Sequence, residues 1–518
     1  MQQKATHKRL RVALVSDEFT YQNLKNVFDI VRITPTNYLE QTNCDLLFVE
    51  SAWQGANGEW CNKVGKAPGS DNTELIRVIK HFQCNNIKTI FWNKEDPMSN
   101  SLYRDTALHC DYIFTIDRDS IKKYRPHKRV YYMPFFFNPK MFNPIYGKQK
   151  INMAMFAGSY YPNYAKRCAL TDKLIKNFCF PGLAIYDRNP GSSEYAFPEE
   201  FHAYIVGGGV GSDKMSEIYK KYKIVLNINT ITDSSTMFAR RVIEAMACNS
   251  VVISSPAKSI AKFFPFVVNS QDDVVISKEA FKLFFDEDYY RQKQLCGMRE
   301  VFANYMDRAV LTRMLQKCAI NIGGWDSPLK ICIADRKNMN VKLLADQTNQ
   351  NYELVEKNDE TEMLVVASRY LLNPFLLEDF ANALKYTAST TSITKDAGQE
   401  YYYVGEANQE CYYRRGKETK ILNINNSWQE KESQPAIDYE ALYIGSNNKK
   451  NAYIDALLTI KNRELGQNSQ IRKRNEHLER ANLELRNQLN AVYYSRFWRL
   501  TKPLRAPKKL LAPRKKAR

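Results

Sequence analysis

The sequence predicts an α/β protein with two tandem Rossmann-like domains, followed by a small α/β module and a C-terminal helix. Two observations carry this prediction. Short apolar runs alternate with helical stretches through residue 322, and the series restarts after residue 150. Several runs are continuously apolar, which is typical of strands buried on both faces of a parallel sheet. Repeated strand–helix units of this kind indicate a doubly wound fold.

Residues 1–145 form the first predicted domain. Its expected strands are RVALVS (11–16), DLLFVES (45–51), KTIFWN (88–93), DYIFTID (111–117) and VYYMPFF (130–136). Between them, TELIRVIKHF (73–82) has helical spacing of its apolar residues.

Residues 150–322 form the second predicted domain, after a Pro- and Asn-containing linker at 138–150. Its expected strands are 151–159, 182–187, 202–207, 223–229 and 250–255. Its expected helices are 216–222 and 237–247, with a long helical segment at 279–320.

Residues 328–430 form the third, smaller module, in which 330–335, 341–346, 362–368 and 400–405 are short apolar runs. Residues 451–495 return to a helical pattern with a weak heptad, either a short coiled coil that makes a homo-oligomer or a single helix packed on the body. Residues 496–518 are a basic amphipathic tail.

The net charge of +19 is concentrated at the ends of the chain. Residues 496–518 alone carry ten Lys and Arg and no acidic residue. This distribution, and the absence of a recognition motif, argue against nucleic acid as a partner. No charge-free run is long enough for a membrane span, and the cysteines lack metal-ligand spacing, so we expect a cytoplasmic protein with reduced thiols.

The stretch KIVLNINTITDSSTMFARRVIEAMACNSVVIS (223–254) reads strand, polar loop, helix, strand. Asp233, Ser234 and Thr236 are residue types that cap helix N-termini, where unpaired N–H groups favour a diphosphate. Glu244 would lie ~12 Å further along that helix, at ~1.5 Å per residue, and beside Arg240. The alternative is an exposed Arg–Glu pair on an ordinary Rossmann helix.

This stretch resembles the donor-site helix of GT-B glycosyltransferases, and more closely that of the spore-maturation CgeB-like branch. Further pieces resemble that branch in the same order, over roughly residues 10–320. The pieces are LLFVESAWQGANGEW (46–60), FWNKEDP (91–97), FTIDRDSIKKY (114–124), FAGSYYP (156–162), AIYDRN (184–189) and TMFARRVIEAMA (236–247).

The resemblance implies a nucleotide-sugar donor in the second domain. Retaining members commonly carry two glutamates eight residues apart on this helix. Glu244 matches the later, ribose-binding one, whereas Thr236 stands in place of the earlier one, and Asn249 stands where relatives often have glycine. The expected donor-binding residues are Gly158, Ser159, Asn229, Asp233, Ser234, Thr236, Arg240, Arg241 and Glu244.

Gly158 and Ser159 would end the first strand of the second domain, where ligands of open α/β sheets bind. A glycine there lets backbone N–H groups approach a phosphate. Lys166 and Arg167 follow and could neutralise its charge.

Glu95 and Asp96 end a buried strand of the first domain and are the candidate catalytic residues. One of them could deprotonate or orient an acceptor hydroxyl, or the pair could form a turn or helix cap. Trp53 and Trp60 could stack on a sugar or pack as a lid.

The third module resembles a degenerate GT-A domain in the pieces DQTNQNYELV (346–355) and LLNPFLLEDFANALKYTAS (371–389). GT-A enzymes carry an Asp-x-Asp metal site before the second piece, but this chain has VVASRY (365–370) there. We therefore expect no metal and no other cofactor.

These observations predict a metal-independent glycosyltransferase, with either a retaining or an inverting outcome, that moves a sugar from a nucleotide-sugar to a hydroxyl acceptor. The acceptor would be a glycan or a lipid-linked precursor in cell-surface polysaccharide or glycolipid synthesis. The tail, with aromatic residues among its cations, would hold the protein at the anionic inner face of the cell membrane. The alternative is a catalytically silent glycan-binding or scaffold protein.

Overall fold

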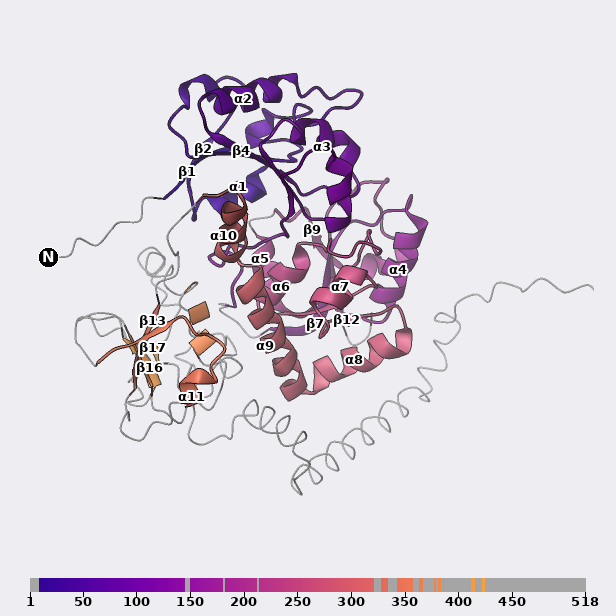
Figure 1. Ribbon diagram of the computed structural model, residues 1–518. Helices are drawn as coiled ribbons and strands as arrows, with labels where there is room; N and C mark the ends of the chain where they lie inside the picture. Colours follow the sequence, from indigo (N-terminus) through magenta and orange to yellow (C-terminus); the bar gives the residue numbers. More distant parts are fainter. Residues whose placement is uncertain are drawn as a thin grey trace, which may run out of the picture. The chain divides into compact units, whose positions relative to one another are not determined.

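Figure 1 shows the computed structural model of the chain. It describes residues 9–144, 150–179, 182–211, 214–320, 328–333, 342–356, 363–366, 377–378, 381–382, 385, 411–414 and 422–423. The expected helix at 451–495, the tail at 496–518 and the apolar run at 400–405 lie outside the described residues.

Six parallel strands form the first sheet, in the order β2-β1-β3-β4-β5-β6. They are β1 (Arg11–Val15), β2 (Asp29–Arg32), β3 (Leu46–Glu50), β4 (Lys88–Asn93), β5 (Tyr112–Thr115) and β6 (Val130–Tyr132). The sequence predicts all of them except β2, whose four residues, DIVR, include two charges and form an edge of the sheet.

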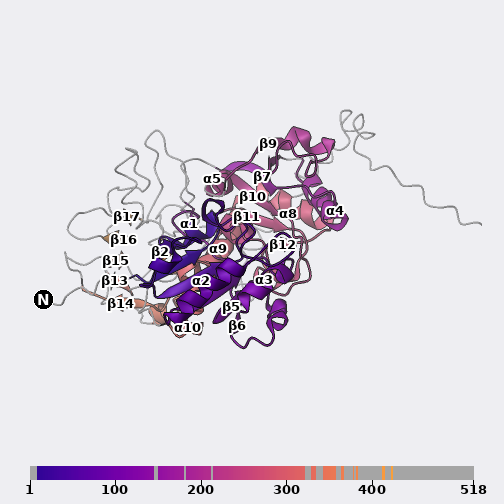
Figure 2. The same ribbon diagram turned by 90° about the horizontal axis from the view of Figure 1, so that it is seen from above.

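The side chains of β1 alternate between two cores, one on each face of this sheet. Ala13 and Val15 join a core with α2 (Thr73–Cys84) and α3 (Asn100–Ala107), which lie in front of the strands in Figure 2. Val12 and Leu14 join the other core with α1 (Glu18–Leu24) and α10 (Asp307–Lys317). The first sheet is thus covered partly by a helix that follows the second domain in the chain.

Six parallel strands also form the second sheet, in the order β12-β11-β10-β7-β8-β9. They are β7 (Ile151–Gly158), β8 (Leu183–Asp187), β9 (Ile205–Gly208), β10 (Tyr222–Asn227), β11 (Val251–Ser254) and β12 (Val268–Asn269). The two sheets confirm the predicted pair of Rossmann-like domains.

In the described part of the chain, six helices accompany the second sheet, of which α4 and α7 were not predicted from the sequence. They are α4 (Ala165–Lys176), α5 (Met215–Lys221), α6 (Arg241–Ala247), α7 (Lys258–Phe263), α8 (Asp273–Phe285) and α9 (Glu287–Asn304). The single helical segment predicted at 279–320 was wrong, because the chain there forms the end of α8, then α9 and α10. Asp286 separates the first two and caps α9, accepting a 3.0 Å hydrogen bond from Tyr289 N.

The third module contains a five-stranded sheet in the order β14-β13-β15-β16-β17. β13 (Leu329–Ile333) pairs in parallel with β14 (Tyr352–Leu354) and β15 (Met363–Val366). β16 (Cys411–Arg414) pairs antiparallel with β15, and β17 (Leu422–Asn423) antiparallel with β16. The apolar run at 341–346 forms a short helix, α11 (Lys342–Ala345). Within the described ranges, no helix is both long and apolar enough to cross a bilayer.

Candidate functional site

The predicted site residues of the second domain gather after the carboxyl ends of its parallel strands, the edge at which open α/β sheets bind ligands. Gly158 is the last residue of β7. A Cβ atom at this position would lie 2.9 Å from Phe156 Cζ, so any larger residue would displace the Phe156 ring, and 3.5 Å from Arg241 Nη2, which is an ordinary contact. The next residue, Ser159, accepts a 2.8 Å hydrogen bond from Asn189 Nδ2, which follows β8.

Two arginines converge beside this strand end. Arg167, on α4, is 9% exposed, and its Nη1 donates to Ile228 O (3.0 Å) and Thr230 Oγ1 (2.9 Å). Arg241, the first residue of α6, lies over the Phe156 ring, 5.4 Å from its centroid.

Each of the two guanidinium groups has a buried hydrogen-bond donor that is unpaired. Arg167 Nε and Arg241 Nη1 are buried and have no hydrogen-bond partner. Burial, and then the neighbouring charge of Arg241, lower the pKa of Arg167 to about 10. Buried donors without acceptors cost free energy, and two adjacent cations repel each other. An anion bound between them would relieve both penalties.

Glu244 lies on the next turn of the same helix and is 2% exposed, so the alternative of an exposed Arg–Glu pair is wrong. Its Oε1 faces Arg240 Nε at 2.7 Å but accepts no hydrogen bond of regular geometry. Burial raises the pKa of Glu244, and the charges of Arg240 and Arg241 oppose that rise. The Arg240 guanidinium also stacks on Phe19 of α1, 3.1 Å from the ring centroid, which brings α6 against the first domain.

The predicted start of this helix was wrong. α6 begins at Arg241, and two of the residues predicted to cap it, Ser234 and Thr236, bond to the first domain. Ser234 Oγ donates to Asp117 Oδ1 at 2.7 Å, and buried Thr236 Oγ1 accepts from Arg118 N at 2.9 Å. These contacts hold the polar loop against the segment that follows β5, so the loop does not form a helix N-terminus.

The two other polar candidates of this region have different surroundings. Asp233 is solvent-exposed and pairs weakly with Lys258, at 3.9 Å. Asn229 is buried, and its Nδ2 donates to Ser254 Oγ (2.9 Å) and Ser255 O (2.7 Å). Asn229 therefore ties the end of β10 to that of β11, and its side chain is occupied within the domain.

In the first domain, the two predicted acidic residues differ sharply. Asp96 is buried and accepts four hydrogen bonds. Its donors are Asn93 Nδ2 (3.1 Å), Asn100 Nδ2 (2.7 Å), Thr115 Oγ1 (2.6 Å) and Tyr124 Oη (2.6 Å). Its carboxylate is fully engaged inside the domain, where burial raises its pKa.

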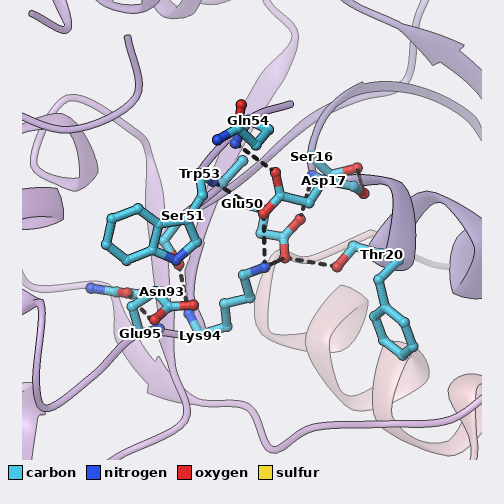
Figure 3. Close-up of polar contacts among 12 residues, drawn as sticks. Ser16, Asp17, Thr20, Glu50, Ser51, Trp53, Gln54, Asn93, Lys94 and Glu95 are labelled. Carbon is cyan, nitrogen blue, oxygen red and sulfur yellow. Dashed lines mark hydrogen bonds and ion pairs between the residues drawn. The ribbon is translucent and has the colours of Figure 1, made fainter. Parts of the chain in front are cut away.

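Glu95 is only half-buried and lies in a charged cluster at the ends of β1, β3 and β4 (Figure 3). Lys94 is the centre of this cluster, with its Nζ 2.6 Å from Glu50 Oε1 and 3.1 Å from Asp17 Oδ2. Burial alone would lower the pKa of Lys94, but the carboxylates of Glu50 and Asp17 outweigh it and raise that pKa. Burial also raises the pKa of Glu95, with Lys94 opposing.

Sequence reasoning missed Asp17 and Glu50. Glu50 is the last residue of β3, and Asp17 follows β1 by two residues. Their position after buried strands was the available signal, and parallel strands bring such positions to one edge. Trp60, which was a candidate for sugar stacking, is buried in the core with its indole N–H donating to Ile33 O at 2.7 Å. Among the residues that the structure describes, no group of three or more His, Cys, Asp or Glu side chains could hold a metal ion.

Together, the sheets and these residues define an α/β protein with two tandem Rossmann-like domains. One domain carries two arginines with unpaired buried donors at its strand ends, and the other carries a carboxylate-rich cluster. Residues 182–315, which include α6, match the family described as glycosyl transferase-like.

Several solved structures are similar to this chain. A glycosyltransferase from Rickettsia africae is 12% identical and covers 59% of this chain and 88% of its own, with a TM-score of 0.37. Sucrose-phosphate synthase from Thermosynechococcus elongatus is 12% identical and covers 60% of this chain and 98% of its own, with a TM-score of 0.38. HepE from Anabaena, in complex with UDP-glucose, is 10% identical and covers 60% of this chain and 91% of its own, with a TM-score of 0.41. A comparison with curated proteins finds no match.

Proposed function

We propose that this protein is a glycosyltransferase that moves a sugar from a nucleotide-sugar to a hydroxyl acceptor. The observation that carries the proposal is the pair of buried donors, Arg167 Nε and Arg241 Nη1, left without partners beside the glycine that ends β7. The glycosyl transferase-like match over residues 182–315 supports the interpretation of this domain as the nucleotide-sugar domain.

The donor diphosphate would lie between the two guanidinium groups. During transfer, the bond from the anomeric carbon to the diphosphate oxygen breaks, and negative charge builds up on the departing nucleoside diphosphate. Fixed cations in a buried site stabilise such charge without reorganising, which is the main way a protein lowers this barrier. Arg167 is held by Ile228 O and Thr230 Oγ1, so one edge of its guanidinium is fixed and the other is available.

Glu244 would bind the ribose of the donor. Its Oε1 accepts no regular hydrogen bond in the structure, and a ribose hydroxyl is a suitable donor. Burial raises the pKa of Glu244 and the charges of Arg240 and Arg241 oppose that rise; in its ionised form the carboxylate accepts stronger hydrogen bonds than a neutral group does.

Glu95 would accept the proton of the acceptor hydroxyl as the bond from its oxygen to the anomeric carbon forms. A carboxylate whose pKa is raised by burial is a stronger base than an ordinary one. Asp96 is a poorer candidate for this role, since four donors already occupy its carboxylate.

The resemblance to the CgeB-like branch supports finer parts of the proposal. The acceptor would belong to cell-surface polysaccharide or glycolipid synthesis, and transfer would need no metal. Residues 496–518 would bring the protein to an anionic membrane surface, and residues 451–495 would let it self-associate. The degenerate GT-A-like module would have a structural or acceptor-handling role.

A catalytically silent glycan-binding or scaffold protein is the second candidate. The observation that favours it is Thr236, which stands where retaining relatives carry a glutamate and is engaged by Arg118 N at 2.9 Å. Such a protein would bind the nucleotide but turn over no donor.

Isothermal titration of the full chain with UDP, GDP, ADP, CDP and dTDP tests the donor site. We expect one of them to bind, and Arg241→Gln to weaken that binding by ~1.5–3 kcal/mol, or roughly 10- to 150-fold in Kd, because a charge-assisted contact is lost. Glu244→Gln in the same titration tests the ribose contact. Arg77→Gln is the matched control, because Arg77 is an exposed arginine on α2. Equal affinity in wild type and Arg241→Gln, or no binding of any diphosphate, would contradict the proposal.

A further inference from the structure

Trp53 is an exposed aromatic side chain in the loop that follows β3. It is 48% exposed, although large aromatic side chains are usually buried to a greater extent. The Tyr103 ring meets it edge-on, with centroids 5.7 Å apart and planes at 85°. The indole is therefore supported from within the domain while part of its surface remains open to solvent.

The loop that carries Trp53 is held in place by one carboxylate. Asp17 accepts hydrogen bonds from the backbone N–H groups of Trp53 (3.1 Å), Gln54 (2.9 Å) and Gly55 (2.9 Å) (Figure 3). Lys94 pairs with the same carboxylate. Loop order of this kind lowers the entropy cost of binding, because the aromatic surface is positioned before the ligand arrives.

The charges around Trp53 restrict the kind of ligand that it would receive. Asp17, Glu50 and Glu95 are three carboxyl groups, and Lys94 is the cation among them. The Glu95 carboxyl group lies beside the Trp53 indole, which opposes the rise that burial gives to the pKa of Glu95 (Figure 3). Excess negative charge repels phosphate and carboxylate ligands, and the charged rim is unsuited to a lipid chain.

An aromatic face beside a carboxylate suits a sugar ring. One side of a hexopyranose presents polarised C–H groups, which are attracted to the negative face of an indole, while its hydroxyl groups donate hydrogen bonds to a carboxylate. An uncharged sugar also avoids the repulsion that the cluster imposes on anions.

We propose that Trp53 and Glu95 bind the acceptor, and that the acceptor ends in an uncharged hexopyranose residue. Trp53 stacks on the C–H face of that residue, and Glu95 accepts a hydrogen bond from one of its hydroxyl groups. Asp17 is a positioning residue, since it holds the loop that carries Trp53. The assignment of the bound sugar as the acceptor rests on the proposed function, whereas the sugar-binding surface itself does not depend on it.

Saturation-transfer NMR with the full chain tests this surface. The probes are methyl α-D-glucopyranoside, methyl α-D-galactopyranoside and methyl α-D-mannopyranoside, with methyl α-D-glucuronide as the anionic counterpart. We expect saturation of the ring C–H protons of at least one uncharged glycoside and none of the glucuronide. Trp53→Ala should lower the affinity about three- to tenfold, the value of an aromatic stacking contact, whereas Trp53→Phe should retain part of it.

Two further variants give the matched control and the positioning readout. Phe285→Ala removes another exposed aromatic side chain, on α8 of the second domain, and should leave the signals unchanged. Asp17→Ala should weaken sugar binding as Trp53→Ala does. Asp17→Asn should restore most of it, because an asparagine Oδ1 can still accept from Gln54 N and Gly55 N.

The outcomes separate this inference from the proposed function. If a nucleoside diphosphate binds but no uncharged glycoside does, or if Trp53→Ala binds sugar like wild type, the acceptor-site inference is overturned and the donor site stands. Binding of the glucuronide as strongly as the uncharged glycosides would overturn the charge argument. If Trp53-dependent sugar binding occurs without any nucleotide binding, the sugar site stands and the proposed function fails. Nucleotide binding that is unchanged in Trp53→Ala shows that the variant is folded.

Discussion

Glu95 and Asp96 are adjacent in the chain, but the fold gives their carboxyl groups different tasks. Asp96 holds together the ends of β4 and β5 and the start of α3, through Asn93, Thr115 and Asn100. Glu95 stays half-buried beside Lys94 and Trp53. The sequence predicts an acidic pair at a strand end, but it does not show which member is saturated, because two of the four donors to Asp96, Thr115 and Tyr124, are distant in the chain.

Substitution of Asp96 should therefore impair folding before it affects chemistry. We expect Asp96→Ala to lower the free energy of unfolding by on the order of 3 kcal/mol, because hydrogen bonds to a buried charged group are lost and their donors are left unsatisfied. Urea denaturation measures the change, with Glu95→Ala as the adjacent control and an expected loss within about 1 kcal/mol. An Asp96→Ala protein that unfolds at the wild-type urea concentration yet lacks turnover would make Asp96 a catalytic residue.

At the scale of elements, the strands were easier to predict than the start of α6. Buried parallel strands are recognisable in the sequence as continuous apolar runs, as in β3 and β4. The helix was expected from residue 237, because the loop before it is rich in cap residues. In the structure, Ser234 and Thr236 instead form hydrogen bonds with Asp117 and Arg118, which are more than a hundred residues away. No local sequence pattern predicts these long-range hydrogen bonds.

The end of α6 follows local rules more closely. Asn249 has φ 58°, the left-handed conformation that glycine usually supplies after a helix and that asparagine tolerates. Asn249 is therefore compatible with the backbone conformation that a glycine would give at this position.

Lys150, which precedes β7, holds the ends of two helices together. Its Nζ donates to Lys220 O (2.8 Å) near the end of α5, and to Cys248 O (3.1 Å) and Ser250 Oγ (2.8 Å) after α6. Burial lowers the pKa of Lys150 to about 7. The groups that face it are the Lys220 ammonium and the Cys248 thiol, whose pKa burial raises to about 11.

This pKa predicts a stability that rises with pH. Between about pH 7 and pH 10 the unfolded chain keeps the Lys150 proton, whereas the folded chain has released it. The free energy of unfolding should therefore increase over this interval by up to ~1.4 kcal/mol per pH unit. Urea denaturation at pH 7, 8 and 9 should compare wild type with Lys150→Met, whose side chain at position 150 cannot titrate. Because both proteins contain Lys220 and Cys248, the contributions of these two residues to the pH dependence cancel in the comparison. Equal slopes in the two proteins would exclude Lys150 as their source.

At the scale of the whole molecule, the order of the two Rossmann-like domains was predictable, and their connection was not. The sequence assigns residues 307–317 to the second domain, yet α10 packs on the first sheet through Val310, Leu311 and Met314. Apolar spacing predicts that a helix has a buried face, but it does not identify the sheet that covers it. The same limit applies to the stacking of Arg240 on Phe19, which joins the start of α6 to α1.

The proposed transfer requires the two domains to act on one reaction, the arginine pair on the donor and the carboxylate-rich cluster on the acceptor. Incubation of the full chain with a nucleotide-sugar panel and uncharged methyl hexopyranosides in EDTA, with chromatography of the products, tests this most directly. We expect nucleoside diphosphate and a methyl disaccharide to form in equal amounts, and Arg241→Gln to form both roughly 10- to 150-fold more slowly. Absence of disaccharide from every donor, with or without added manganese, would contradict transfer, and activity that appears only with manganese would contradict metal independence.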